Sequence, residues 1–173
     1  DSLRKEALTF LGVHREHAAA DDFRATQAEM TGLYPTVFEA YVRRGVTLEL
    51  LAPDLLHYDL VRLGAALHAE RDLEFTYLGL QTLYDRYFLH IEESRIELPQ
   101  AFFMRVAMGL AINEIDREAR AIEFYQVMSS FDFMSSTPTL FNAGTRHSQL
   151  SSCYLTTVTD DLDGIYQAIK ENA

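Results

Sequence analysis

Cysteine, tryptophan and basic residues are scarce in this sequence, and each shortage excludes a class of protein. Of its 173 residues one is cysteine and none is tryptophan, and 15 basic residues stand against 26 acidic ones, for a formal net charge of −11. A single cysteine excludes an internal disulfide framework and suits a reducing cytoplasm. The acidic balance disfavours general nucleic-acid binding, which relies on Lys and Arg to neutralise phosphates.

Long apolar runs and metal-ligand patterns are missing as well. No apolar stretch approaches the roughly 20 residues that a membrane helix needs, so we expect no membrane contact. His14 and His17 stand three residues apart near Glu16, but no third strong ligand is indicated and we predict no metal site. The start lacks an initiator Met and an apolar signal core, and the end falls inside a helical pattern. We therefore expect a fragment of a longer protein.

The first two thirds of the sequence show helical periodicity. With 48% hydrophobic and 24% charged residues, the composition is that of a globular protein with a sizeable core. Pro99 is placed to start a helix, and Arg95–Leu98 before it suits a brief extended piece. Apolar residues recur at helical spacing in segments at about 3–18, 34–45, 55–67, 77–88, 99–111 and 117–130.

The pattern changes near Phe131. Residues 131–145 are rich in small polar side chains and predict a loop, and residues 150–158 are apolar and β-branched and predict a strand. Asp160 and Asp161 then supply N-cap chemistry for a final helix. We expect a mainly α-helical N-terminal region followed by the first strand and helix of an α/β unit.

Cys153 lies on the predicted strand, shortly after a loop rich in hydroxyl and amide side chains at 135–145. Taken alone, a lone cysteine is most often a small buried hydrophobic residue, and such a loop is an ordinary structural one. A thiol on a rigid strand beside hydroxyl donors also suits redox chemistry next to an anion site. For Asp160, Asp161 and Asp163, helix capping is a sufficient account, with binding of a nucleotide sugar as the alternative.

Four ordered segments resemble the large catalytic subunit of ribonucleotide reductase, class I in particular. The resemblance is in register from about Tyr34 onward. It implies a helical N-terminal domain over 23–147, preceded over 1–22 by the end of an ATP-cone-like region. Residues 148–173 would begin a ten-stranded α/β barrel, truncated here after its first strand and helix. The four segments are Thr76–Tyr87 (TYLGLQTLYDRY), Pro99–Gly109 (PQAFFMRVAMG), Ser135–Thr145 (SSTPTLFNAGT) and Gln149–Leu155 (QLSSCYL).

The resemblance also implies roles for individual residues. Cys153 would be one of the paired redox cysteines that reduce the ribose 2′ position of a ribonucleoside diphosphate, after a separate thiyl radical has abstracted the 3′ hydrogen. Thr137 and Ser152 would contact the substrate together with Cys153. The helix that follows would take part in the contact between two alpha subunits. The residues that would bind the deoxynucleotide effector are Asp160, Asp161 and Leu162.

The partners implied by the resemblance lie outside this sequence. They are dNTP and ATP effectors, a radical from a metal-containing beta subunit, and thioredoxin or glutaredoxin as reductant, all in the cytoplasm. The second redox cysteine, the radical cysteine and the catalytic Asn and Glu are not in the sequence, so we expect this fragment alone to bind no cofactor and to be inactive. Two alternatives stay open: a cobalamin-dependent class II reductase, and a non-catalytic helical interaction module in which Cys153 is merely buried.

Overall fold

The computed structural model describes residues 2–10 and 26–172. Within these ranges the fold is mainly helical, with a short antiparallel hairpin in which His90 pairs with Arg95 and Ile91 with Ser94. The elements in chain order are α1 (Ser2–Phe10), α2 (Gln27–Thr47), the 3-10 helix η2 (Pro53–His57), α3 (Leu60–Ala65), the 3-10 helix η3 (Ala69–Leu73), α4 (Tyr77–Arg86), β1 (His90–Ile91), β2 (Ser94–Arg95), α5 (Pro99–Ala111), α6 (Arg117–Ser129), α7 (Thr137–Asn142) and α8 (Leu162–Glu171).

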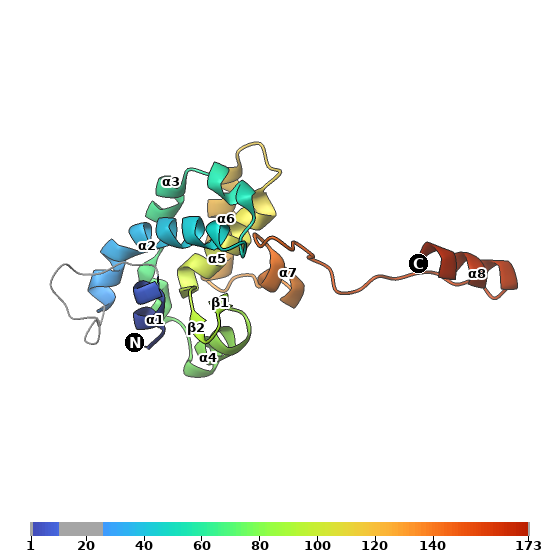
Figure 1. The fold of residues 1–173 in the computed structure, drawn as a ribbon, viewed down its shortest axis with the longest axis horizontal. Coiled ribbons are helices and arrows are strands. Elements are labelled where there is room, and N and C mark those ends of the chain that lie inside the picture. Colours follow the sequence, from blue (N-terminus) through green and yellow to red (C-terminus); the bar gives the residue numbers. More distant parts are fainter. Residues whose placement is uncertain (1, 11–25, 173) are drawn as a thin grey trace.

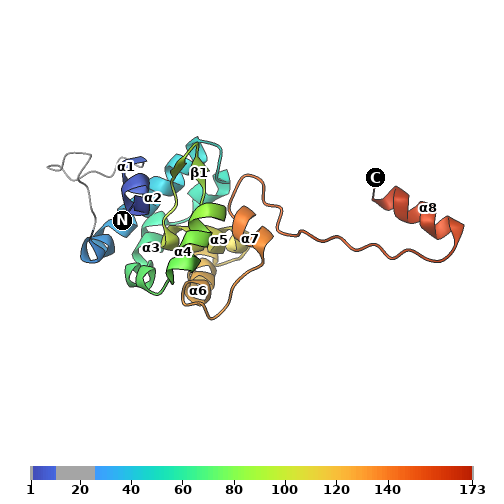
Figure 2. The same cartoon turned by 90° about the horizontal axis from the view of Figure 1, so that it is seen from below.

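Helix α5 is the centre of the helical body, by which we mean residues 2–10 and 26–150. The chain is buried without a break from Ile96 to Met108, so α5 is covered all round rather than along one stripe. Helix α6 packs along α5, and α2 contacts α5, α3 and η3 (Figures 1 and 2). The large side chains that fill this core include Tyr34, Phe38, Tyr41, Phe102, Phe103 and Tyr125.

Helix α2 begins earlier than the apolar stripe from Tyr34 to Gly45 predicted. Thr26 and Glu29 form a reciprocal capping box at its start. The N–H of Thr26 donates to Glu29 Oε2 at 2.8 Å, and the N–H of Glu29 donates to Thr26 Oγ1 at 3.4 Å. Because these bonds satisfy N–H groups that a helix start leaves without partners, the helix extends to Gln27.

Asp72 ties α1 to α2 and α5. Its carboxylate accepts hydrogen bonds from the Tyr34 hydroxyl at 2.8 Å, the Gln100 side-chain amide at 3.0 Å and the Arg4 guanidinium at 3.3 Å. The Asp72 side chain is only 7% exposed. Burial raises the pKa of this carboxyl above its ordinary value, although the bonds from Gln100 and Tyr34 act in the opposite direction.

The prediction of a strand over residues 150–158 is wrong: these residues form no strand in this structure. Residues 151–172, which we call the C-terminal segment, leave the helical body as an unpaired stretch and end in α8 (Figure 1). A β-branched run becomes a strand only when a neighbour accepts and donates its backbone hydrogen bonds. The hairpin of β1 and β2 is the only sheet among the described residues, so the barrel stays a prediction.

The loop predicted over 131–145 contains a helix. Pro138 lies in the first turn of α7, where its missing N–H leaves no intrahelical bond unmade. The predicted helices that start at Pro99 and Arg117 are confirmed, as is the N-cap at Asp161. Of the helix predicted over 3–18, the structure shows α1; the remainder lies outside the described residues.

Across the described residues, no helix combines the length and the apolar character that crossing a bilayer takes. Nor do the His, Cys, Asp and Glu side chains of these residues form a group of three that would hold a metal ion. His14 and His17 lie outside the ranges that the structure describes.

Candidate functional site

A buried ion pair lies against the end of α7, the helix that begins at Thr137. The side chains of Glu97 and Arg105 are both fully buried, and Arg105 Nε donates to Glu97 Oε1 at 2.6 Å. The Tyr41 hydroxyl donates to the same oxygen at 2.5 Å, and the N–H of Leu89 donates to Glu97 Oε2 at 2.8 Å. Burial by itself lowers the pKa of Arg105, but the charges of Glu97 and Tyr41 and the hydrogen bonds to them together outweigh burial and raise that pKa. The carboxylate is therefore satisfied by a matched cation and two neutral donors.

The other donors of Arg105 hold the end of α7. Its Nη1 donates to the carbonyl oxygens of Ala143 at 2.7 Å, Leu140 at 3.2 Å and Phe141 at 3.3 Å. Carbonyls at a helix C-terminus have no intrahelical partner, and a cation is favourable there. One side chain of α5 thus fixes the position of α7.

Two glycines bring α5 and the segment after α7 into backbone contact. A Cβ on Gly109 would lie 2.0 Å from the backbone nitrogen of Gly144. Gly144 has a φ of 75°, in the left-handed region that favours glycine. On its other side, the N–H of Ala52 donates to the Gly144 carbonyl at 3.0 Å. The end of the Ser135–Thr145 motif is held from two directions.

Thr137 is the first residue of α7, and its side chain is exposed. Its Oγ1 lies 3.2 Å from the hydroxyl oxygen of Tyr87, which follows the last residue of α4. The Tyr87 ring stacks on Phe141, with centroids 4.6 Å apart and planes 15° apart. The neighbouring Ser136 instead bonds within the loop, 3.2 Å from the hydroxyl of Thr139. The Thr137 hydroxyl therefore joins the start of α7 to Tyr87 at the end of α4.

Cys153 and Ser152 lie on the C-terminal segment, and both are exposed. Cys153 Sγ lies 3.8 Å from Ser152 Oγ. The structure does not bring this pair to Thr137, because Thr137 packs against α4 while the C-terminal segment leaves the body (Figure 2). An exposed thiol is nevertheless open to exchange, unlike the buried residue that a lone cysteine usually is.

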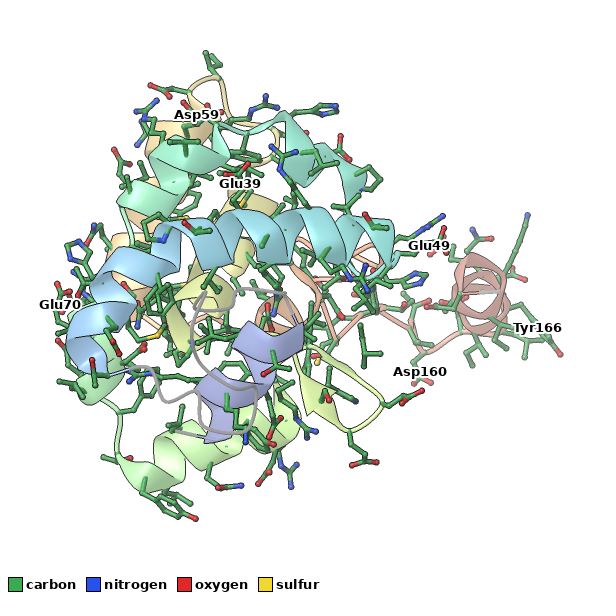
Figure 3. The ribbon with its side chains drawn as sticks, turned by 60° about the vertical axis from the view of Figure 1, so that its left-hand side comes forward. Glu39, Glu49, Asp59, Glu70, Asp160 and Tyr166 are labelled. Carbon is green, nitrogen blue, oxygen red and sulfur yellow. The ribbon has the colours of Figure 1, made fainter. Side chains whose placement is uncertain are left out.

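The predicted effector residues gather at the start of α8. The Asp161 carboxylate accepts from the N–H of Gly164 at 2.8 Å. Hydrogen bonds from the Thr159 hydroxyl and from this N–H hold the pKa of Asp161 below its ordinary value. Asp160 and Leu162 are exposed beside it. Figure 3 shows Asp160 on the C-terminal segment, apart from the body that carries Glu39 and Asp59.

No sequence motif assigns a role in the site to Glu97, Arg105, Tyr41 or Tyr87. A signal was present for Arg105, the only charged residue between Leu98 and Asn113. A charged side chain inside an apolar helix is rarely buried without a partner, so its presence there predicts a buried ion pair. For Tyr87 no such signal exists, because its pairing with Thr137 depends on how α4 and α7 lie together.

Residues 73–148 match the family described as "Ribonucleotide reductase, all-alpha domain". The matched range contains α4, the hairpin, α5, α6 and α7. It therefore includes Thr137, its contact with Tyr87 and the buried ion pair.

Similar curated proteins come from bacteria and from a plant. The ribonucleoside-diphosphate reductase subunit alpha of Chlamydia trachomatis is 55% identical over 137 residues, which are 79% of this chain and 13% of that protein. That of Helicobacter pylori is 49% identical over 117 residues, 67% of this chain and 15% of that protein. The large subunit of Arabidopsis thaliana is 39% identical over 135 residues, 76% of this chain and 16% of that protein. The chain thus spans only about a seventh of the relatives' length.

Proposed function

The chain belongs to the family of ribonucleotide reductase large subunits, and from this premise we propose that it forms part of the catalytic alpha subunit of a class I ribonucleoside-diphosphate reductase. The complete enzyme would reduce ribonucleoside diphosphates to 2′-deoxyribonucleotides for DNA synthesis in the cytoplasm. The relatives' names describe an alpha subunit, which supports the class that takes its radical from a separate beta subunit over the cobalamin-dependent one. We expect residues 1–173 alone to be inactive.

The exposed thiol of Cys153 is the observation that carries this proposal. In the proposed step, Cys153 and a second cysteine elsewhere in the complete subunit supply two electrons and two protons to the substrate. The ribose C2′–O bond breaks, the oxygen leaves as water, and the two sulfurs form a disulfide. Thioredoxin or glutaredoxin then reduces that disulfide by thiol exchange, which requires an accessible sulfur.

Thr137 and Ser152 are proposed to hold the substrate nucleotide. Their hydroxyls donate hydrogen bonds without adding charge. Thr137 begins α7, and Arg105 and Gly144 hold the chain at the end of that helix. Residues 148–173 would begin the catalytic barrel, where pairing of 150–158 as its first strand would carry Ser152 and Cys153 to that loop. Residues 23–147 would form the helical domain and 1–22 the end of an ATP-cone-like region.

The start of α8 is proposed to bind a deoxynucleotide effector. Asp160 and Leu162 present exposed side chains there, whereas Asp161 is engaged in capping the helix. The apolar side chains Ile165 and Ile169 on α8 are also exposed, which supports a contact with a second alpha subunit.

The test uses the complete alpha subunit with its beta subunit and a dithiol reductant. The variant Cys153→Ser should lose turnover of a ribonucleoside diphosphate while keeping the unfolding midpoint of the parent. Ser151→Ala, two residues away and outside the proposed machinery, is the matched control and should retain turnover. Sustained turnover by Cys153→Ser would overturn the redox role of Cys153.

A further inference from the structure

We propose that Tyr87 is a positioning residue for the reaction, which orients the hydroxyl of Thr137 toward the substrate. This inference rests on the proposed substrate contact of Thr137. Tyr87 directly follows the last residue of α4. The sequence motifs assigned it no role in the site, and it is proposed to act only through Thr137.

The contact joins two elements that are fifty residues apart in the chain. Tyr87 Oη and Thr137 Oγ1 are 3.2 Å apart. Tyr87 is half-buried and Thr137 is exposed, so the phenol approaches the threonine from the protein side. The outward side of the threonine hydroxyl faces solvent, where a ligand can reach it.

The chemistry of the two hydroxyls sets the direction of the bond. A phenol is a stronger hydrogen-bond donor and a weaker acceptor than an aliphatic alcohol, so Tyr87 donates and Thr137 accepts. A threonine hydroxyl has one proton and two lone pairs. When one lone pair takes the Tyr87 proton, the Thr137 proton is directed away from α4 and remains for a ligand oxygen.

Both partners are held in place, which is what a positioning role requires. The Tyr87 ring is stacked on Phe141 of α7, and its backbone N–H donates to the Leu83 carbonyl at 2.9 Å. The far end of α7 is held by Arg105. The stack and the hydroxyl contact lie one turn apart on α7, so Tyr87 fixes both the placement and the rotation of this helix start.

The experiment uses the complete alpha subunit with its beta subunit and measures kcat and KM separately. Tyr87→Phe removes the hydroxyl and keeps the ring that stacks on Phe141. We expect KM for the ribonucleoside diphosphate to rise about fivefold with kcat and the unfolding midpoint retained, since a hydrogen bond of this kind is worth a factor of about 2–10. Tyr84→Phe, one helical turn earlier, loses a hydroxyl bonded to Glu6 instead and should leave KM unchanged.

A double variant separates this inference from the proposed function. In a Thr137→Val background, Tyr87→Phe should have no further effect on KM, because the phenol then has no hydroxyl to orient. If Thr137→Val itself leaves KM unchanged, the proposed substrate contact fails and the inference falls with it. If Thr137→Val raises KM but Tyr87→Phe does not, or if the two effects simply multiply, the positioning role alone is overturned.

Discussion

The helical body and the C-terminal segment of this chain differ in what their side chains contact. In the body, apolar residues from α2, α5 and α6 fill one core, and two carboxylates are buried with their donors supplied by other elements. In residues 151–172 only Ala168 is buried, and Leu155 is 97% exposed. The hydrogen bonds of the segment are made mostly inside it, as between Thr156 and Asn172.

This difference shows where each region gets its structure. The body buries its apolar residues in one core built from its own elements. The C-terminal segment places Tyr154, Leu155 and Tyr166 in solvent, and such side chains are normally covered when they occur together. We infer that other residues of the complete subunit cover Tyr154 and Leu155, and that the proposed second alpha subunit covers the exposed side chains of α8.

The largest effect on the body should come from breaking its buried ion pair. Arg105→Met leaves the Glu97 carboxylate buried without its cation and three carbonyls without a donor. Loss of one member of such a pair costs about 3–5 kcal/mol. Urea unfolding of this chain measures that loss.

The matched control is the exposed ion pair of Arg43 and Glu39, whose charged atoms lie 2.9 Å apart. Arg43→Met should cost less than about 0.5 kcal/mol, because solvent screens the pair. Equal losses in the two variants would contradict the central role of the buried pair.

A smaller loss of unfolding free energy is expected from a substitution where α5 contacts the segment after α7. Gly109→Ala places a Cβ 2.0 Å from the Gly144 nitrogen, and overpacking of this kind costs about 1–3 kcal/mol. Gly32→Ala on α2 is the control, since nothing lies within 4 Å of the added carbon. That substitution should stabilise the protein by up to about 1 kcal/mol, so unfolding curves of the two variants should shift in opposite directions.

The pKa values of two aspartates should also distinguish the helical body from the C-terminal segment. Burial raises the pKa of Asp72 in the body, and hydrogen bonds lower that of Asp161 in the C-terminal segment. Carboxyl NMR titration should therefore find the two midpoints on opposite sides of the ordinary value of 3.8. Midpoints on the same side would refute the assignment.

The stability consequence for Asp72 has a definite sign. Folded protein holds the Asp72 proton more tightly than unfolded protein does, so its contribution to stability is present below pH 3.8 and falls as pH rises through the raised pKa. Each unit of separation between the two values corresponds to about 1.4 kcal/mol. The difference in unfolding free energy between the parent and Asp72→Asn, measured against pH, should decline across this window and then level off.

The smallest effect should follow removal of the C-terminal segment. A chain that ends at residue 150 keeps the core, the ion pair and the bond from Asn142 Nδ2 to the Gln149 carbonyl. Its unfolding free energy should stay within about 0.5 kcal/mol of the parent. A loss above about 1 kcal/mol would mean that the segment packs on the body, and the comparison would fail.

The helices could be predicted from the sequence because local signals specify them. Pro99 marks the start of α5, and the Asp161 side chain caps α8. The strand over 150–158 could not be judged in the same way, since a strand depends on partners that local sequence does not contain. Helix α7 was not predicted, because its small polar residues usually favour loops. In the structure, Arg105 stabilises this segment as a helix by donating to the carbonyl groups at its end.

The residues of the candidate site differ in the same way in how far the sequence predicts them. Cys153 and Thr137 were found through motifs and through the chemistry of thiols and hydroxyls. Tyr87 and Glu97 were not, because each acts through a contact more than five residues away along the chain. The roles of the motif residues themselves remain predictions that the variants above will test.

The bonds from Arg105 to the end of α7 have a consequence for the order of events during synthesis. During synthesis Arg105 emerges from the ribosome before residues 140–143 do, and at that stage the guanidinium lacks the three carbonyl acceptors that it later uses. Translation adds about 5–20 residues per second, so α5 waits seconds for them. We therefore expect the core around Arg105 to close only once α7 has emerged.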